Sequence, residues 1–484
     1  MDKVIITLFA LFAGYQSQMM ALIEAARVFA KLLGVELIGW SEIDPIVQVS
    51  HNLAFPEYKD RCYPDVTKID WQGVKDFDIL MYSSPCQSVS RAGRREGIKK
   101  DSGTESSLLW HVEKAIAVKR PKWLIMENVE GMLDADFTED FISWNRTLAT
   151  YGYKSYCRVL CAADYGVPQN RNRLFLVSER IDADNTPAFN WPEPIQLVKK
   201  PVDLLSEKVD DKYYMTAEES ETFIDLIYNA RKGYNRKVQC DERHPSKFLS
   251  SQFERKVHTM VFPLAKNGTI HTLMTSCQGG NLASITGCRH ERCSCVIEIW
   301  EGKEDIKPTL LYDQKSSEQT VKAKRACPDR ERIISLIESI KPNQYVRIRR
   351  LTPTECLRFM GVKELYINRM VNPYPTLQSE GYTKEQIDQI CTSKGRHYEL
   401  SDYALYGRAG NAIVVDVLTA LFTKILETYV SEPSRKATAK PIKQMSLAER
   451  KRQYARNYYE RHRDAVKAKS RDYHRKRRLA NKQQ

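Results

Sequence analysis

One cysteine of this sequence stands directly after an apolar run, where a chain leaves a strand for a loop. Cys86 lies in the segment Ser-Pro-Cys-Gln at 84–87, after the run 78–82. Such a cysteine can be exposed and polarised by backbone dipoles, and both effects favour the thiolate, which is the attacking species. Glu127 follows another apolar run, 123–126, in the same way. The pair suits a nucleophile and a carboxylate that accepts or donates protons. The alternative interpretations are a small cysteine buried in the core and a glutamate at a helix N-terminus.

A glycine turn and two carboxylates suit a nucleoside cofactor. The turn 11–15, with Gly14, separates the first apolar run from a helical segment, and Glu42 ends the second run. A carboxylate there can accept hydrogen bonds from both ribose hydroxyls. Asp65 follows the next segment, where it could hold an adenine amino group. The Gly-x-Gly-x-x-Gly fingerprint is absent, which argues against a nicotinamide dinucleotide site.

Two arginines alternate in the segment Gln-Asn-Arg-Asn-Arg at 169–173. Arg171 and Arg173 point the same way if this segment is extended, and together they could cradle a phosphate or a polar base edge. The alternative is an edge strand whose charges are solvated.

Apolar runs predict the scaffold that positions these residues. The runs 4–12, 37–41, 78–82, 123–126 and 174–178 predict strands, and residues 19–33 predict an amphipathic helix capped by Gly34. Strand–helix alternation predicts a parallel sheet with helices on both faces and ligands beyond the carboxyl ends of its strands. Residues 352–360 and 411–429 predict two later helices, and residues 363–402 predict a polar insertion.

Length and charge extend this prediction to partners. A chain of 484 residues exceeds the roughly 250–300 at which single cores stop growing, so we expect several domains. Nearly all of the net charge of +14 lies in residues 431–484, where tyrosines alternate with Lys and Arg. This basic helical tail is more typical of contact with a nucleic-acid backbone than of a solubilising extension. We expect a cytoplasmic protein without membrane contact, since no apolar run or signal peptide indicates otherwise.

A cysteine cluster in the middle of the chain does not change this interpretation. The spacing of its members does not match common zinc patterns, so we predict free thiols and no metal. The cluster comprises Cys277, Cys288, Cys293 and Cys295, with His290 among them.

Taken in order, these segments resemble the cytosine-5 DNA methyltransferase family. The resemblance covers residues 4–180 and about 345–425. Two departures stand out: the usual second glycine of the Phe-x-Gly-x-Gly turn is Gln16, and the usual Pro-Pro-Cys reads Ser-Pro-Cys. The matching segments are Phe12-Ala-Gly14, Ser41-Glu42-Ile-Asp44-Pro45, Asp65-Val66, Pro85-Cys86-Gln87-Ser88, Glu127-Asn128-Val129, Gln169 to Arg173, Arg350 to Cys356 and Gly410-Asn411-Ala412-Ile413.

The resemblance implies a fold and an activity. It implies a Rossmann-like α/β sheet that binds S-adenosylmethionine and methylates carbon-5 of a flipped cytosine in double-stranded DNA, within a restriction-modification or phage modification system. Cys86 attacks carbon-6, Glu127 contacts the ring nitrogen and amino group, and Arg171 and Arg173 complete the catalytic set. Gln87, Ser90, Asn128 and Gln169 are expected to contact substrate. Cofactor contacts are expected from Phe12, Ala13, Gly14, Tyr15, Glu42, Ile43, Asp65, Val66, Pro85, Asn411 and Ala412.

The resemblance also implies a division of the chain. Residues 1–180 form the catalytic domain, 181–345 an irregular target-recognition domain, 346–430 a return segment that completes both, and 431–484 the basic tail of a monomer. A tRNA cytosine methyltransferase remains an alternative, although the long stretch between 173 and 350 favours DNA. A catalytically silent DNA-binding relative is another, and binding of S-adenosylmethionine would discriminate it.

Overall fold

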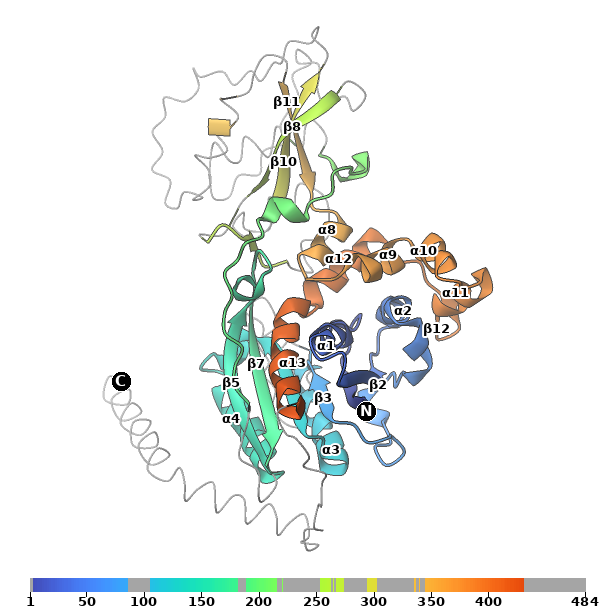
Figure 1. The fold of residues 1–484 in the computed structure, drawn as a ribbon, viewed down its shortest axis with the longest axis vertical. Coiled ribbons are helices and arrows are strands. Elements are labelled where there is room, and N and C mark those ends of the chain that lie inside the picture. Colours follow the sequence, from blue (N-terminus) through green and yellow to red (C-terminus); the bar gives the residue numbers. More distant parts are fainter. Residues whose placement is uncertain are drawn as a thin grey trace, which may run out of the picture.

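A six-stranded sheet forms the centre of the molecule (Figure 1). The computed structural model describes residues 3–85, 105–181, 189–215, 253–262, 267–273, 294–302 and 344–430, and residues 220, 264, 335, 336 and 339. The strand order is β2-β1-β3-β4-β7-β5. The strands are β1 (Val4–Leu11), β2 (Leu33–Ser41), β3 (Ile79–Tyr82), β4 (Trp123–Val129), β5 (Tyr153–Cys161) and β7 (Asn172–Arg180).

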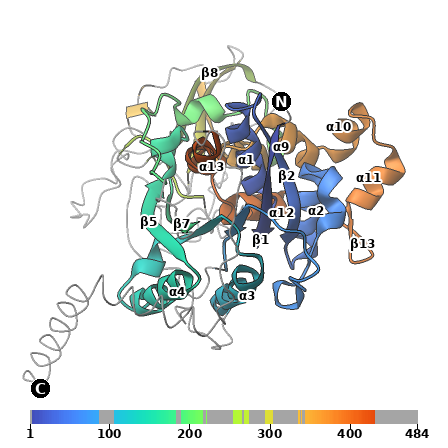
Figure 2. The same cartoon turned by 60° about the horizontal axis from the view of Figure 1, so that its bottom comes forward.

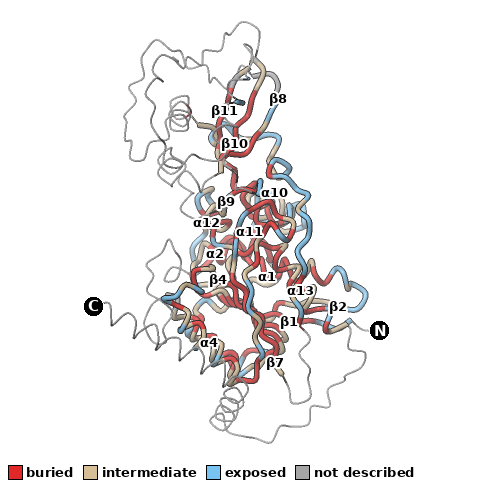
Figure 3. Tube along the Cα trace, turned by 90° about the vertical axis from the view of Figure 1, so that its left-hand side faces the viewer, coloured by how far each residue is buried: buried red, intermediate tan, exposed pale blue. Residues whose placement is uncertain are grey.

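Helices cover both faces of this sheet, as expected (Figure 2). Alternate residues of β1 point to opposite faces: Leu8 packs with one layer of helices, and Phe9 packs with the other. Buried residues line the sheet and the helices against it (Figure 3). The first layer holds α1 (Ser17–Arg27), α2 (Pro45–Ala54) and α13 (Val415–Val430), and the second holds α3 (Leu109–Lys119) and α4 (Thr138–Thr150).

The sheet is mixed, so the expectation of a wholly parallel sheet is wrong at one strand. The strands β1 to β4 pair in parallel, whereas β7 runs antiparallel to both β4 and β5. Only residues 162–171 connect β5 to β7, through the short turn η5 (Ala162–Tyr165) and β6 (Gln169–Asn170). A parallel connection needs a crossover of about a dozen residues or more, usually a helix. The short connection therefore reverses the chain direction.

Two predicted helix boundaries are also wrong. The helix α1 ends at Arg27, and Gly34 lies within β2 and not at a helix end. A Cβ atom on Gly34 would stand 2.6 Å from Ile5 Cδ1, so the glycine permits close packing between strands. At the other end of the chain, Asn411 ends α12 (Asp402–Asn411), and α13 begins four residues later.

Residues 363–402, expected as a polar insertion, form a helical layer against α2. Each short helix turns a few apolar side chains inward, including the fully buried Ile367, Leu377 and Ile387. Arg369 ties the layer to the end of α2, because its Nη1 donates to the Ala54 carbonyl at 2.7 Å. The elements are α9 (Glu364–Val371), α10 (Pro373–Ser379), α11 (Lys384–Ile390), and the paired strands β12 (Thr392–Ser393) and β13 (Arg396–His397).

A second, antiparallel sheet stands apart from the first, in the upper part of Figure 1. It has the order β11-β10-β8. Its strands are β8 (Phe253–Phe262), β10 (Cys295–Gly302) and β11 (Gln344–Arg350). The stretch expected to be irregular thus contains regular structure, and β11 runs directly toward the helix α8 (Pro353–Arg358).

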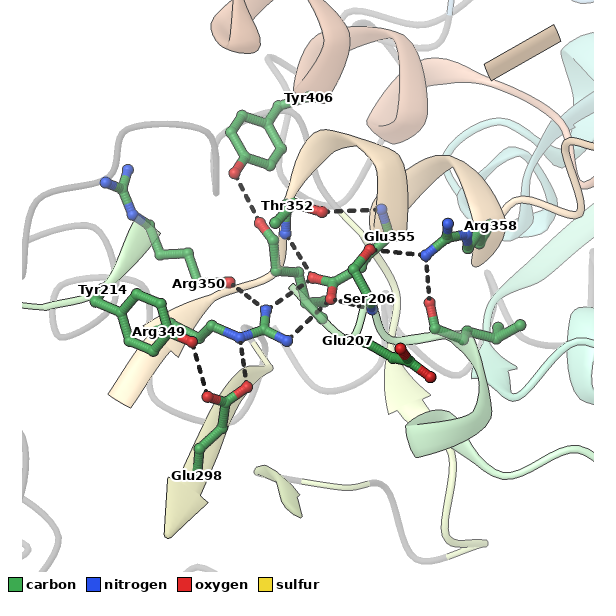
Figure 4. Close-up of polar contacts among 12 residues, drawn as sticks. Ser206, Glu207, Tyr214, Glu298, Arg349, Arg350, Thr352, Glu355, Arg358 and Tyr406 are labelled. Atoms are coloured by element: carbon green, nitrogen blue, oxygen red, sulfur yellow. Dashed lines mark hydrogen bonds and ion pairs between the residues drawn. The ribbon is translucent and has the colours of Figure 1, made fainter. Parts of the chain in front are cut away.

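A buried ionic network fixes the second sheet to α8 (Figure 4). Arg349 of β11 donates from Nε to Glu298 of β10 at 2.9 Å, and from Nη1 and Nη2 to Glu355 of α8 at 2.9 Å each. All three side chains are fully buried. Tyr214 also donates to Glu298, at 2.8 Å. Burial opposes ionisation of Glu298, yet the Arg349 guanidinium and these hydrogen bonds hold the pKa of that carboxyl below its usual range.

Several predicted features lie outside the described residues. These are the basic tail, His290, Cys277, Cys288 and Cys293, whereas Cys295 is a buried residue of β10. Within the described part of the chain, no His, Cys, Asp and Glu side chains are grouped so that they could hold a metal ion. No single helix there is long and apolar enough to cross a membrane, although the bent pair α12 and α13 passes by length and composition.

Candidate active site

Strand pairing brings the predicted motifs to one edge of the main sheet. Leu11, the last residue of β1, pairs with Ser41 of β2 and with Tyr82 of β3, and Tyr82 pairs with Met126 of β4. The four parallel strands therefore reach this edge in register. The glycine turn, Glu42, the Ser-Pro-Cys segment and Glu127 all follow within a few residues, where ligands of open α/β sheets bind.

Glu127 is the buried acid of this edge. Its carboxylate accepts a hydrogen bond from the hydroxyl of Ser83, which follows β3. Arg173 of β7 approaches from the other side, with Nε 3.2 Å from Glu127 Oε1. The strand whose direction the sequence pattern did not predict thus supplies the cation beside the acid.

The next residue, Asn128, fixes the loop that carries the predicted nucleophile. Its Nδ2 donates to the Ser84 carbonyl at 3.1 Å, and both residues are buried. Pro85 is the last described residue of this loop, and Cys86, Gln87 and Ser90 lie outside the described residues. Asn128, predicted to contact substrate, therefore positions the loop in this structure.

The glycine turn is built for close approach of its backbone. Phe12 and Gly14 both have positive φ, at 56° and 59°, and no atom lies within 4 Å of the position of a Gly14 Cβ. The Ala13 amide donates to the Ser41 carbonyl at 2.9 Å, which holds the turn against β2. The Gly14 amide donates to Glu42 Oε2 at 3.3 Å. The turn and Glu42, both predicted to bind a nucleoside, are in direct contact.

Glu42 is held by backbone amides of its own loop. Its Oε1 accepts from the Ile43 and Asp44 amides at 2.9 and 3.1 Å. Burial raises the pKa of the Glu42 carboxyl above its ordinary value, against these amides, that of Gly14 and the charge of Arg408. The side chain of Ile43 itself is 61% exposed, so it offers an apolar surface at this edge.

Asp65 and Val66 lie at the start of the turn η2 (Val66–Lys68). Asp65 Oδ1 accepts from the Thr67 amide at 2.9 Å and from the Thr67 hydroxyl at 2.7 Å, and Oδ2 lies 3.3 Å from Lys68 Nζ. The hydrogen bonds from Thr67 lower the pKa of the exposed Asp65 carboxyl. Val66 is buried in the core beneath. Asp65 is thus ordered and accessible, as a contact to a ligand requires.

The structure gives Arg171 a different place from the one expected. Its Nη2 donates to the Gly410 and Ala412 carbonyls at 2.8 and 2.7 Å, and Nη1 donates to the Leu273 carbonyl at 2.9 Å. The side chain is 2% exposed. Backbone carbonyls of two distant segments thus occupy both terminal nitrogens, whereas the sequence predicts that Arg171 cradles a phosphate or a polar base edge.

Gln169 behaves in the same way. Its Nε2 donates to the Phe359 carbonyl at 2.6 Å, and its Oε1 accepts from the Leu273 amide at 3.2 Å. The side chain is fully buried, and both polar atoms of its amide bind backbone groups. Within the Gln-Asn-Arg-Asn-Arg segment, only Arg173 of the predicted residues reaches the acid at the sheet edge.

A comparison with protein families matches residues 6–378 to the C-5 cytosine-specific DNA methylase family. The chain belongs to this family. The match includes the sheet edge just described, Arg171 and its partner Leu273.

Relatives within the family are modification methyltransferases. The chain is 39% identical to the type II methyltransferase M2.ScrFI of Lactococcus lactis subsp. cremoris over 153 residues, or 32% of this chain and 42% of that relative. It is 25% identical to the orphan methyltransferase M.SPRI of Bacillus phage SPR over 451 residues, or 83% of this chain and 94% of that one. The chain matches three of these relatives, M2.ScrFI among them, over less than half of the relative's own length.

Solved structures share the fold. A DNMT2 mutant from Spodoptera frugiperda superposes with a TM-score of 0.50 at 15% identity, over 87% of this chain and 99% of that one. The predicted α/β methyltransferase fold is confirmed.

In this family member, polar atoms without partners lie close to the residues predicted to bind the cofactor. Among the described residues, the buried Tyr15 hydroxyl has no hydrogen-bond partner, and neither do the buried Nε and Nη1 of Arg408, whose charge acts on Glu42. Burial lowers the pKa of Arg408, against the charges of Asp44 and Glu42. A buried polar atom needs a hydrogen-bond partner, so these atoms fit a polar nucleoside cofactor such as S-adenosylmethionine.

Sequence patterns did not single out Ser83, Gln48 or Arg408. Ser83 could have been found from its place immediately before the Ser-Pro-Cys segment. Gln48 of α2 donates from Nε2 to the Glu42 carbonyl at 2.6 Å. Arg408 belongs to α12 and interacts electrostatically with Asp44 and Glu42. Neither of these two stands beside a recognisable motif, so only the fold shows their place.

Proposed function

We propose that this chain transfers a methyl group from S-adenosylmethionine to carbon-5 of a flipped cytosine in DNA, with Cys86 as the nucleophile. The buried Glu127, held between Ser83 and Arg173, carries the proposal. Cys86 lies two peptide units after Ser84, whose carbonyl Asn128 holds. Two residues of chain span at most about 7 Å, and this short reach supports a thiol that acts together with the acid.

The reaction follows from these two groups. The Cys86 thiolate bonds to carbon-6 of cytosine, and the electron pair of the broken ring double bond becomes available at carbon-5. Glu127 contacts the ring nitrogen and the amino group, where negative charge develops. S-adenosylmethionine, when bound, would supply the methyl group to carbon-5 and leave as S-adenosylhomocysteine. Carbon-5 would then lose its proton to a base, and the returning electron pair would expel the Cys86 thiolate. Stacked bases bury these carbons, so the cytosine must leave the duplex.

The cofactor would lie along the edge formed by β1 and β2. Glu42 would accept the ribose hydroxyls, since Oε2 accepts only one amide, that of Gly14, among the hydrogen bonds of the described residues. Asp65 would take the adenine amino group in exchange for its exposed contact with Lys68. The remaining contacts to the cofactor would come from Phe12, Ala13, Tyr15, Pro85 and the segment that contains Asn411 and Ala412.

We assign positioning roles to Arg171 and Gln169. They tie the loop before β7 to residue 273 on one side and to residues 359, 410 and 412 on the other. The return segment is thereby fixed against the catalytic sheet. Arg173 remains the candidate catalytic cation, because it contacts Glu127 directly.

Double-stranded DNA is the proposed partner, and modification of a short target sequence is the proposed role. The region 181–345 would read the target, since a domain of this size can supply the ~1,000–2,500 Å² of a specific DNA interface. The basic residues of 431–484 would contact phosphates irrespective of sequence. The names of the relatives support a restriction-modification or phage-borne system.

Methylation sequencing tests the proposal. DNA from a methylation-free host that expresses this chain should carry methylated cytosine in one recurring motif, and a Cys86→Ala control should carry none. Unmethylated DNA despite correctly folded protein would refute the DNA activity, and methylated RNA in the same cells would identify an RNA substrate instead. A Cys86→Ser protein should still bind S-adenosylmethionine, and turnover by that variant would refute the nucleophile.

A further inference from the structure

Gln16 combines two unfavourable features at the start of α1. Its backbone is left-handed, with φ at 74° and ψ at 44°, a conformation that favours glycine and costs other residues roughly 1–2 kcal/mol. Its side chain is fully buried, and neither Nε2 nor Oε1 has a hydrogen-bond partner in the part of the chain that the structure describes. A chain that needed only the turn would be more stable with glycine here. The glutamine is therefore explained better by a ligand than by the fold.

The position of Gln16 indicates which part of a ligand it meets. It precedes α1 and follows the Gly14 turn by two residues, and Gly14 contacts Glu42. No side chain caps α1, and its first turn contains no acidic residue. The amides at such a helix start attract an anion. A negatively charged group of the ligand is thus expected next to the glutamine amide.

We propose that the Gln16 side-chain amide binds the amino-acid end of S-adenosylmethionine, in place of the glycine usual in the family. A primary amide donates from Nε2 and accepts at Oε1. One amide can therefore donate to the carboxylate and accept from the ammonium group of the same zwitterion. The inference rests on the proposed function, and it assigns this end of the cofactor to a side chain where a glycine would offer only backbone.

Two ligands separate this contact from the rest of the cofactor site. S-adenosylhomocysteine carries the amino-acid end, and methylthioadenosine lacks it while keeping the nucleoside. The experiment measures the dissociation constant of each ligand by calorimetry with the full-length protein, without DNA. Gln16→Met keeps the length of the side chain and removes the amide. We expect its affinity for S-adenosylhomocysteine to fall tenfold or more, as for a lost hydrogen bond to a charged group, and its affinity for methylthioadenosine to stay within about twofold.

Two further variants distinguish binding from folding. Gln16→Gly adopts the positive φ readily, so its ligand-free melting temperature should equal or exceed that of the native protein while S-adenosylhomocysteine binding still weakens. Glu42→Gln should weaken both ligands, since both contain the ribose.

The outcomes are distinguishable. Equal affinities of native and Gln16→Met proteins for S-adenosylhomocysteine would overturn the inference, and so would an equal loss for both ligands. Failure of the native protein to bind S-adenosylhomocysteine at all would instead refute the cofactor assignment on which the inference rests.

Discussion

Replacing Glu355 by alanine removes the carboxylate on which the second sheet and α8 meet. This carboxylate accepts two hydrogen bonds from Arg349 at 2.9 Å, one from the Thr352 amide at 2.7 Å and one from the Ser206 amide at 2.8 Å. Neither Glu355 nor Arg349 is exposed. The Glu355→Ala protein would keep a buried guanidinium with half of its ionic partners, so the free energy of unfolding should fall by about 3–5 kcal/mol.

A more exposed ion pair, which joins the end of α8 to the start of α9, supplies a matched control. Arg358 donates to Glu364 from Nε at 2.6 Å and from Nη2 at 3.2 Å. Like the contact between Arg349 and Glu355, this one is a bidentate pair of hydrogen bonds. These side chains are 24% and 55% exposed, so solvent screens the pair. Glu364→Ala should therefore cost no more than about 1 kcal/mol.

Urea unfolding followed by tryptophan fluorescence compares the two variants with the native protein. Hydrogen exchange of residues 294–302 and 344–350 localises the effect, because loss of the Arg349 contact should release β10 and β11 first. A Glu355→Ala protein as stable as Glu364→Ala would refute the reasoning, since burial would then not distinguish the two ion pairs.

Two further predictions concern Gly361 and His51. Gly361 has φ at 74°, and a Cβ on it would stand 1.9 Å from Asp416 Oδ2, whereas Gly395 has φ at 73° and open space. Gly361→Ala should lower the free energy of unfolding well beyond the roughly 1–2 kcal/mol expected for Gly395→Ala in the same urea assay; equal losses would exclude the clash. Burial lowers the pKa of His51, stacked on Trp40, from 6.5 to about 3. Below pH 6.5 the unfolded chain takes up a proton on this ring and the folded chain does not. As the pH is lowered from 6.5 to about 3, the free energy of unfolding therefore falls through this group by up to about 1.4 kcal/mol for each pH unit. His51→Phe should flatten the pH profile by that amount, and an unchanged slope would show that the ring is not held neutral.

The sequence predicted those parts of the fold that depend on apolar runs. All five predicted strands are present, because each contains a continuous apolar segment that becomes buried in the sheet. The strand β5 was missed, since Tyr153–Cys161 exposes several of its residues, whereas β2 at the opposite edge ends in buried ones. The direction of β7 was wrong because an apolar run carries no information about direction. The helices α9 to α11 were missed because each is at most eight residues long, too short for a helical period to stand out.

Glu127 and its cation illustrate how much of a site short-range patterns can predict. Each motif stands at a strand end, so placing Glu127 near the glycine turn and the Ser-Pro-Cys loop needed only the strands. The contact between Glu127 and Arg173 depends on the reversed strand β7, which pairs Arg173 with Val129 across the sheet. The predicted residues Glu127 and Arg173 therefore meet at this edge, although the sequence did not specify their contact.

Arg171 marks the limit of that approach. Two residues before Arg173, it has the same charge and alternation, so the pattern alone assigns both arginines to one task. The structure separates them: Arg173 reaches the acid, whereas Arg171 is surrounded by carbonyls of residues 273, 410 and 412. Those partners lie up to 241 positions away in the chain. A buried guanidinium satisfied by backbone cannot turn to substrate without leaving several carbonyls unpaired, a cost of about 1–3 kcal/mol for each. Its charge is better explained by the need to hold distant segments against the catalytic sheet than by contact with the base.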